Sequence, residues 1–238
     1  MPSQTILITG AGGFLGSLLA DTIVRLQPDL HDFRFILCDV NPPKPPTDPK
    51  AKFTILTVDL TQPSESERLF QTEMGKPDVI YSLHGIMSKG SEQDWDFGFR
   101  VNFDSTRYLL EAARRITPGV KFIFSSSVGV FGGKLPEVVL PETIATPEGA
   151  YGTAKLMCEY LITEYSRKGF VDGRVIRLPT ITVRPGPPAA ATTSFVSGII
   201  REPLQGMETV CPIGSSIQDP ILEKLEIWIS SPTTVLEK

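Results

Sequence analysis

The stretch Thr5-Ile-Leu-Ile-Thr-Gly-Ala-Gly-Gly-Phe-Leu-Gly16 is the strongest indicator of the fold. Residues 5–9 are a short apolar run typical of a buried strand, and residues 17–25 have the pattern of a helix. The glycines between them suit a tight turn, close approach of a pyrophosphate to the backbone, and close packing of the helix on the sheet: Gly10, Gly13 and Gly16. Strand, glycines and helix in this order predict a dinucleotide site with the phosphates at the helix N-terminus.

A second apolar strand, residues 33–38, is followed by Asp39. A carboxylate at this position suits hydrogen bonds from the ribose hydroxyls of an adenosine. A negative charge there would repel a 2′-phosphate, so Asp39 favours NAD over NADP. The alternative interpretation is a glycine turn beside a solvated aspartate.

Apolar strands and helical segments alternate through the following residues. We expect strands at residues 53–58, 78–83, 120–124 and 174–178, and helices from about residue 63, at 94–115 and at 149–167. This alternation predicts an α/β fold with a doubly wound parallel sheet, the Rossmann arrangement. We expect residues 1–178 to form an NAD-binding domain and residues 179–238 a small, partial substrate-binding lobe.

The chain changes character after Pro179. Pro185, Pro187 and Pro188 predict a loop, residues 189–201 predict a short helix, and the last thirty-odd residues show no strong periodicity.

Two polar motifs predict the chemistry. Ser125, Ser126 and Ser127 follow the fifth strand, and Tyr151 and Lys155 lie four residues apart on one helix face. A neighbouring ammonium stabilises a phenolate, which is a general base toward a substrate hydroxyl; the protonated phenol is the matching acid. A serine at the strand end would hold that hydroxyl. A solvated Tyr/Lys face is the alternative, but the preceding strand–helix units and the glycines favour a functional pair.

Residues near the end of the fourth strand are further candidates. His84 follows this strand, where a histidine can be catalytic, but we expect a turn histidine bonded to the backbone. Gly85 would allow close approach of the cofactor. Asn102, on the helix at 94–115, needs a hydrogen-bond partner if it is buried.

Composition excludes several classes of protein. The 238-residue chain has a net charge of −4 and no basic run, which argues against binding to nucleic acid. Cys38, Cys158 and Cys211 are scattered without metal-ligand spacing, so we expect reduced thiols and no metal site. No segment reaches the ~18 apolar residues of a membrane span, and no secretory segment is recognisable, so we expect a cytoplasmic protein with no membrane contact.

Together these motifs resemble the extended short-chain dehydrogenase/reductase family, also called the NAD-dependent epimerase/dehydratase family. The resemblance runs from about Thr5 to at least Pro203. It implies a catalytic Ser127, Tyr151 as the base, and Lys155 bound to the nicotinamide ribose. It also implies that Asp59 and Leu60 flank the adenine. The other implied cofactor contacts are Gly10, Gly13, Phe14, Leu15, Gly16, Asp39, Leu83, Gly85, Asn102, Tyr151 and Pro179. Members of the family also lead us to expect a homodimer through the helices at 94–115 and 149–167.

Within the family, residues 177–186 and 197–204 resemble the D-erythronate dehydrogenase branch. That branch oxidises the 2-hydroxyl of a four-carbon sugar acid to a 2-oxo acid with NAD. A small anionic substrate needs a cation, and Arg184 and Arg201 are the candidates in the substrate-facing segment. Ordinary surface arginines are the equal alternative for each.

The chain departs from the family pattern in two places. The fourth strand runs into His84-Gly-Ile-Met87 where the family has alanines, and family members continue for several dozen residues beyond position 238. We therefore expect a complete Rossmann core and an incomplete substrate lobe. Two other functions stay open: a nucleotide-sugar epimerase or dehydratase with the same three residues, and a non-catalytic NAD-binding sensor.

Overall fold

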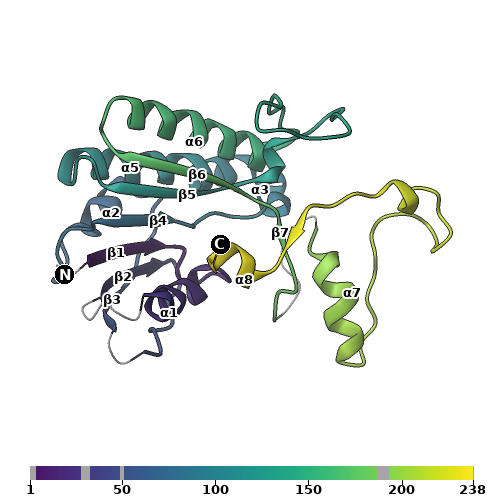
Figure 1. Cartoon of the computed structure of the whole chain (residues 1–238), viewed down its shortest axis with the longest axis horizontal. Coiled ribbons are helices and arrows are strands. Elements are labelled where there is room, and N and C mark those ends of the chain that lie inside the picture. The colour runs from purple at the N-terminus through teal and green to yellow at the C-terminus, as the bar shows by residue number, and fades with distance from the viewer. Residues whose placement is uncertain (1–3, 28–32, 49–50, 187–192, 238) are drawn as a thin grey trace.

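The computed structural model describes residues 4–27, 33–48, 51–186 and 193–237 (Figure 1). Pro187, Pro188 and the expected helix start at Ala189 lie outside the described residues. Six parallel strands form one sheet: β1 Gln4–Thr9, β2 Phe33–Asp39, β3 Ala51–Thr57, β4 Val79–Ser82, β5 Lys121–Ser127 and β6 Asp172–Leu178. Their order is β3-β2-β1-β4-β5-β6, so the expected doubly wound Rossmann sheet is confirmed.

Helices cover both faces of this sheet. On one face lie α2 (Pro63–Arg68), α5 (Ser105–Ile116) and α6 (Ala150–Arg167), and on the other lies α1 (Gly16–Leu26). Two shorter helices, α3 (Ser88–Gln93) and α4 (Trp95–Phe99), precede α5. The short helix α3 was not anticipated from the sequence.

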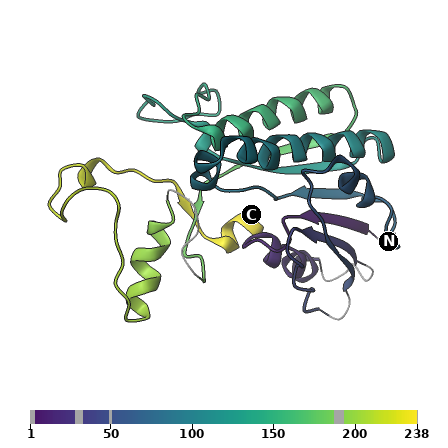
Figure 2. The same ribbon diagram turned by 180° about the vertical axis from the view of Figure 1, so that it is seen from behind.

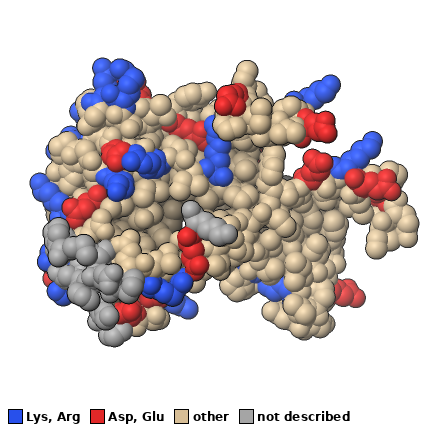
Figure 3. All heavy atoms as spheres, viewed as in Figure 1, with Lys and Arg blue, Asp and Glu red and all other residues tan. Residues whose placement is uncertain are grey.

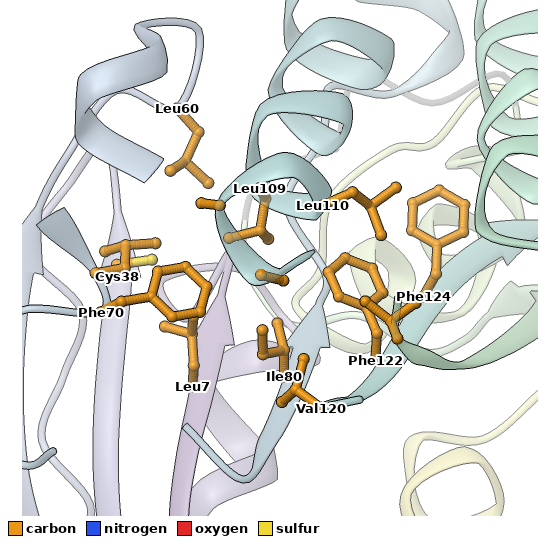
Figure 4. Close-up of a cluster of buried hydrophobic side chains, with 14 of the residues drawn as sticks. Leu7, Cys38, Leu60, Phe70, Ile80, Leu109, Leu110, Val120, Phe122 and Phe124 are labelled. Carbon is orange, nitrogen blue, oxygen red and sulfur yellow. The ribbon is translucent and has the colours of Figure 1, made fainter. Parts of the chain in front are cut away.

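Two hydrophobic clusters follow from alternation along the strands. On β1, Leu7 faces the α2, α5 and α6 side, whereas Ile6 and Ile8 face the α1 side. Figure 4 shows the first cluster, in which Phe122 and Phe124 of β5 pack with residues of α5 and neighbouring strands. Strands buried on both faces read as continuous apolar runs, which is why they were recognisable in the sequence.

The helix expected at residues 94–115 is continuous but irregular. Between α4 and α5 the chain makes a π-helical turn, Arg100–Asp104, with Asn102 at its centre. The hydroxyls of Ser105 and Thr106 donate to the helix carbonyls of Val101 and Asn102, competing with the regular backbone pattern. Such π-bulges are frequent at functional sites.

The residues after β6 form a smaller unit. A two-stranded parallel sheet joins β7 (Thr180–Ile181) to β8 (Ile229–Ser230), and α7 (Phe195–Leu204) projects away from the main sheet (Figures 1 and 2). The last helix, α8 (Pro232–Glu237), returns to α1, where Glu237 pairs with Arg25 at 2.5 Å. The strands β7 and β8 were not anticipated, because pairing across about 50 residues leaves no local pattern. The helix α8 was not anticipated either. The domain boundary at residue 178 stays a prediction.

Charged side chains are dispersed. On the face drawn in Figure 3, Lys and Arg are interspersed with Asp and Glu. No described helix is long and apolar enough to cross a membrane.

Candidate active site

A cavity of about 860 Å³ opens at the carboxyl ends of the strands. Its walls come from the glycine-rich loop after β1, the residues after β4, the end of β5, the start of α6 and the segment after β6. In open α/β sheets this edge, where the strand order reverses, is the usual ligand site. The sheet therefore brings five separated sequence segments to one place.

The glycine-rich loop has no room for a Cβ at Gly10 or Gly16. Gly10 has φ of 70°, and a Cβ on it would lie 2.6 Å from the backbone nitrogen of His84. A Cβ on Gly16, the first residue of α1, would lie 2.1 Å from the Gly10 carbonyl oxygen. Gly10, Gly13, Phe14, Leu15 and Gly16 all line the cavity. The loop thus has the close backbone approach that a dinucleotide pyrophosphate requires.

Asp39 lies beside this loop, at the end of β2. Its Oδ2 accepts a hydrogen bond of 3.0 Å from the Gly12 nitrogen. Asp39 does not line the cavity itself, but it lies half-buried next to the loop, where its carboxylate could accept from a ribose hydroxyl.

The two residues expected to flank the adenine lie differently. Asp59 accepts hydrogen bonds from the backbone and hydroxyl of Thr61, 3.0 and 2.8 Å long. The Leu60 side chain packs in the hydrophobic core, as Figure 4 shows, so only its backbone remains for an adenine contact. Neither residue lines the cavity.

Ser127, Tyr151 and Lys155 all line the cavity. Lys155 is 3% exposed, and its Nζ donates to the Ser125 carbonyl oxygen at 2.8 Å. That nitrogen lies 5.7 Å from the centre of the Tyr151 ring. The Ser127 Oγ accepts from the Gly129 nitrogen at 3.0 Å, which leaves its proton free to donate. A phenol, an ammonium and a hydroxyl around one cavity can exchange a proton with a bound alcohol.

Hydrogen bonds from Asn102 hold the residues that follow β4. Asn102 is 1% exposed; its Oδ1 accepts from the Ile86 nitrogen at 3.0 Å, and its Nδ2 donates to the Ile86 oxygen at 3.1 Å. A Cβ on Gly85 would lie 2.6 Å from the same Oδ1. Leu83 and Gly85 line the cavity, whereas Asn102 does not. Asn102 therefore supports the loop that follows β4, and its contact with the cofactor stays a prediction.

His84 is bonded by hydroxyl groups, not by the backbone as expected. Its Nδ1 lies 2.7 Å from the Thr9 Oγ1 and its Nε2 lies 2.8 Å from the Ser105 Oγ. Burial, with a smaller effect of the nearby Lys155 charge, lowers the pKa of His84 to about 3. A neutral ring held on both sides ties β1, the β4 loop and α5 together.

The two candidate arginines have different environments. Arg201 is 8% exposed, donates to the Arg184 carbonyl oxygen at 2.7 Å and pairs with Glu202. It does not line the main cavity, so the expectation that Arg201 is available to a substrate finds no support in this geometry.

Arg184 does line the cavity, next to Pro179. Its guanidinium lies 5.8 Å from the Phe14 ring centre, and its Nε donates to the Ile181 oxygen at 3.2 Å. Burial lowers the pKa of Arg184, which means that its charge has lost hydration. Within the described part of the chain no carboxylate pairs with it, so an anion in the cavity would find this cation available.

Sequence reasoning missed three residues of this site. The Glu92 Oε1, in the cavity wall, accepts from the Ala150 nitrogen at 2.6 Å and so caps α6 one residue before Tyr151. Glu159 and Arg177 form an ion pair behind Ser127. The spacing of Glu159, four residues after Lys155, was a signal for the same helix face; Glu92 left none.

The comparisons with known proteins agree with this geometry. The model of the NAD dependent epimerase/dehydratase family matches residues 6–219. A D-erythronate dehydrogenase of Haemophilus influenzae is 47% identical over 232 residues, which cover 97% of this chain and 69% of the relative. A D-erythronate dehydrogenase of Cupriavidus necator is 41% identical, over 96% of this chain and 68% of the relative.

A solved structure supports the same relationship. The nucleoside-diphosphate-sugar epimerase from Agrobacterium tumefaciens superposes with a TM-score of 0.82 and 38% identity, covering 99% of this chain and 68% of that one. The chain thus spans about two thirds of the length of these relatives.

Proposed function

The chain belongs to the NAD-dependent epimerase/dehydratase family, and from this premise we propose that it is a dehydrogenase of a small sugar acid. The substrate would be D-erythronate or a close analogue, oxidised at its 2-hydroxyl to the 2-oxo acid. One observation carries the proposal: a single cavity joins the dinucleotide loop, the Ser127, Tyr151 and Lys155 side chains, and the Arg184 guanidinium, which no carboxylate of the described residues pairs with. The names of the two most similar relatives reported above support the substrate.

The proposed mechanism divides the work among three side chains. Tyr151 removes the proton of the substrate hydroxyl, and Ser127 donates a hydrogen bond that orients the substrate oxygen. The buried Lys155 ammonium, held by the Ser125 carbonyl, stabilises the phenolate electrostatically and would bind the nicotinamide ribose. NAD, when bound, supplies the hydride acceptor. The protein contributes position and electrostatics.

Arg184 is the proposed ligand of the substrate carboxylate. A planar guanidinium matches a carboxylate with two parallel hydrogen bonds. Its partial burial gives the pairing greater strength than a surface pair has, because less water competes for the charge. When the carboxylate of a 2-hydroxy acid is bound to Arg184, the reacting hydroxyl is on the carbon next to that carboxylate.

A spectrophotometric assay tests the proposal. Purified protein with NAD and a panel of four-carbon sugar acids should give a substrate-dependent rise at the absorbance band of reduced nicotinamide. The Tyr151→Phe variant should lose turnover by about 10²–10⁴-fold and still bind NAD, because only the acid–base group is removed. A Tyr151→Phe variant with wild-type turnover would refute the assignment.

A nucleotide-sugar epimerase is the second candidate, favoured by the structural match to the Agrobacterium protein. The same assay separates the two activities. A dehydrogenase releases reduced cofactor in step with substrate, whereas an epimerase retains its cofactor through turnover. The protein would be identified as an epimerase if it converted a nucleotide sugar to its epimer with no net reduction of the nicotinamide cofactor.

Two further features belong to the same proposal. A homodimer would use α5 and α6, where Tyr160 and Met157 are exposed at 68% and 38%. A cytoplasmic location is supported by three free cysteines, of which Cys38 and Cys158 are buried.

A further inference from the structure

Behind the cavity lies a buried carboxylate that the proposed mechanism does not use. Glu159 is 7% exposed and lies on α6 one turn after Lys155. Its side chain therefore leaves the same helix face as the catalytic lysine. A buried carboxylate is costly unless it is paired and hydrogen-bonded, so its partners indicate what it does.

Both oxygens of Glu159 accept hydrogen bonds from side chains of β5 and of β6, the strand at the edge of the sheet. Arg177 on β6 donates from Nε to Oε1 and Oε2 at 3.0 and 3.1 Å, and from Nη2 to Oε2 at 2.7 Å. Ser126 on β5 donates its hydroxyl to Oε1. Glu159 thus joins α6 to β5 and β6 at one point.

The register of the sheet places this point directly behind the catalytic serine. Ser126 pairs with Arg177, and the next pair is Ser127 with Leu178, which precedes Pro179. The Ser126 hydroxyl points to Glu159, and the Ser127 side chain leaves the opposite side of the strand, because successive side chains of a strand alternate. Any shift of α6 against β5 at Glu159 therefore changes the placement of Ser127 relative to Tyr151.

Arg177 also reaches the cavity wall. Its guanidinium lies 4.9 Å from the ring centre of Phe131, which lines the cavity. The Phe131 ring in turn lies 6.2 Å from that of Trp228, next to β8. Through the Phe131 ring, the ion pair is thus connected to Trp228 and the segment at β8.

We propose that Glu159 and Arg177 are positioning residues for the reaction. Their ion pair fixes the distance between Ser127 and the Tyr151–Lys155 face of α6, and it holds Phe131 in place as part of the cavity wall. This inference rests on the proposed function of Ser127 and Tyr151. The Glu159 carboxylate is buried, whereas the Arg177 side chain is 30% exposed. Replacing a desolvated ion pair by well-packed apolar residues is often neutral for stability, whereas small misplacements of reacting groups cost about 100-fold in rate.

The test uses Glu159→Gln and Arg177→Lys, with Glu164→Gln as the matched control. Glu164 lies on the same helix and pairs with Arg167 at 2.6 Å, but this pair is exposed. We expect kcat to fall about 10–100-fold in both test variants, with the KM for NAD within about twofold of wild type. The control should match wild type in both constants. Each rate is divided by the number of NAD-binding sites, so that partial unfolding does not count as lost catalysis.

A second readout does not depend on the substrate. The fluorescence of bound NADH reports the surroundings of the nicotinamide, and it should change in the test variants while the Kd of NADH stays near wild type. If Glu159→Gln fails to bind NADH, Ser126→Ala decides, because it removes only one contact to Glu159. Unchanged kcat per site together with unchanged NADH fluorescence would overturn the inference. Wild-type protein inactive on every sugar acid would instead refute the proposed function, and the fluorescence would still test the positioning.

Discussion

Replacing Gly16 by alanine tests the dinucleotide loop most directly. The added Cβ would lie 2.1 Å from the Gly10 oxygen, whereas real Cβ atoms essentially never come closer than 3.0 Å. The two backbone segments must therefore separate by about 0.9 Å, the difference between these distances. The nearest atoms to the added Cβ belong to the backbone of Gly10 and Ala11, so no side-chain rotation relieves the contact. Overpacking of this kind costs about 1–3 kcal/mol in the free energy of unfolding.

The same displacement moves the phosphate-binding backbone. We expect the Kd of NAD to rise by about 100-fold, which is a loss of about 2.7 kcal/mol in binding free energy. At an NAD concentration of 100 times the wild-type Kd, the ligand stabilises the wild-type protein by about 2.7 kcal/mol. The variant at that concentration would gain only about 0.4 kcal/mol, because the ligand then equals its own Kd.

Thermal unfolding with and without NAD measures both effects. Gly90→Ala is the control, since a Cβ there meets only the flexible end of Ile86 at 3.8 Å, and alanine favours the helix α3. This control should keep the full NAD-dependent rise in Tm. A Gly16→Ala protein with wild-type Tm and the full NAD response would refute the close-packing argument.

Two other perturbations follow from the site. His84 has a pKa lowered to about 3 by burial, so the folded protein binds fewer protons than the unfolded chain below about pH 6.5. The free energy of unfolding should therefore fall as pH drops, by up to about 1.4 kcal/mol per pH unit between about pH 6.5 and 3. Urea titrations at several pH values should show a smaller change of the unfolding free energy with pH for His84→Gln than for the wild type. Arg184→Gln should raise the KM for a sugar acid about 10–100-fold with little effect on NAD binding, since it removes a charge-assisted pair; Arg167→Gln, on the exposed helix surface, is the control. An unchanged KM in the Arg184 variant would place the substrate carboxylate elsewhere.

The parts of the site carried by short continuous motifs could be predicted from the sequence. The loop from Gly10 to Gly16 was identifiable because each glycine has a local geometric task between a strand and a helix. Tyr151 and Lys155 were identifiable because helical spacing puts them on one face. The ends of the six strands of the sheet were predicted to within two residues, except that β5 runs three residues further than expected, to Ser127. They were recognisable because continuous apolar runs are typical of strands buried on both sides.

Residues whose role depends on distant partners were assigned less well. Asn102 and His84 were visible as polar residues, but only the packed structure shows that the first supports Ile86 and that the second lies between Thr9 and Ser105. Leu60 was expected near the adenine, and the structure shows that only its backbone is left for this contact, because its side chain packs into the core; the contact itself stays a prediction. Arg201 was expected to be available to an anion and is instead bonded to the Arg184 carbonyl oxygen and to Glu202.

Local pattern, then, was sufficient for the six strands of the main sheet, for the longer helices that cover it and for the glycine loop, and it predicts the three reactive side chains, because each depends on neighbours within a few positions. Tertiary packing alone decided which charges are available in the cavity. Arg184 and Arg201 are equivalent as sequence letters, yet burial and pairing leave only Arg184 beside the open space. Packing likewise decided the junction of Glu159 with Arg177 and Ser126, since its three residues meet only when α6 lies across the ends of β5 and β6.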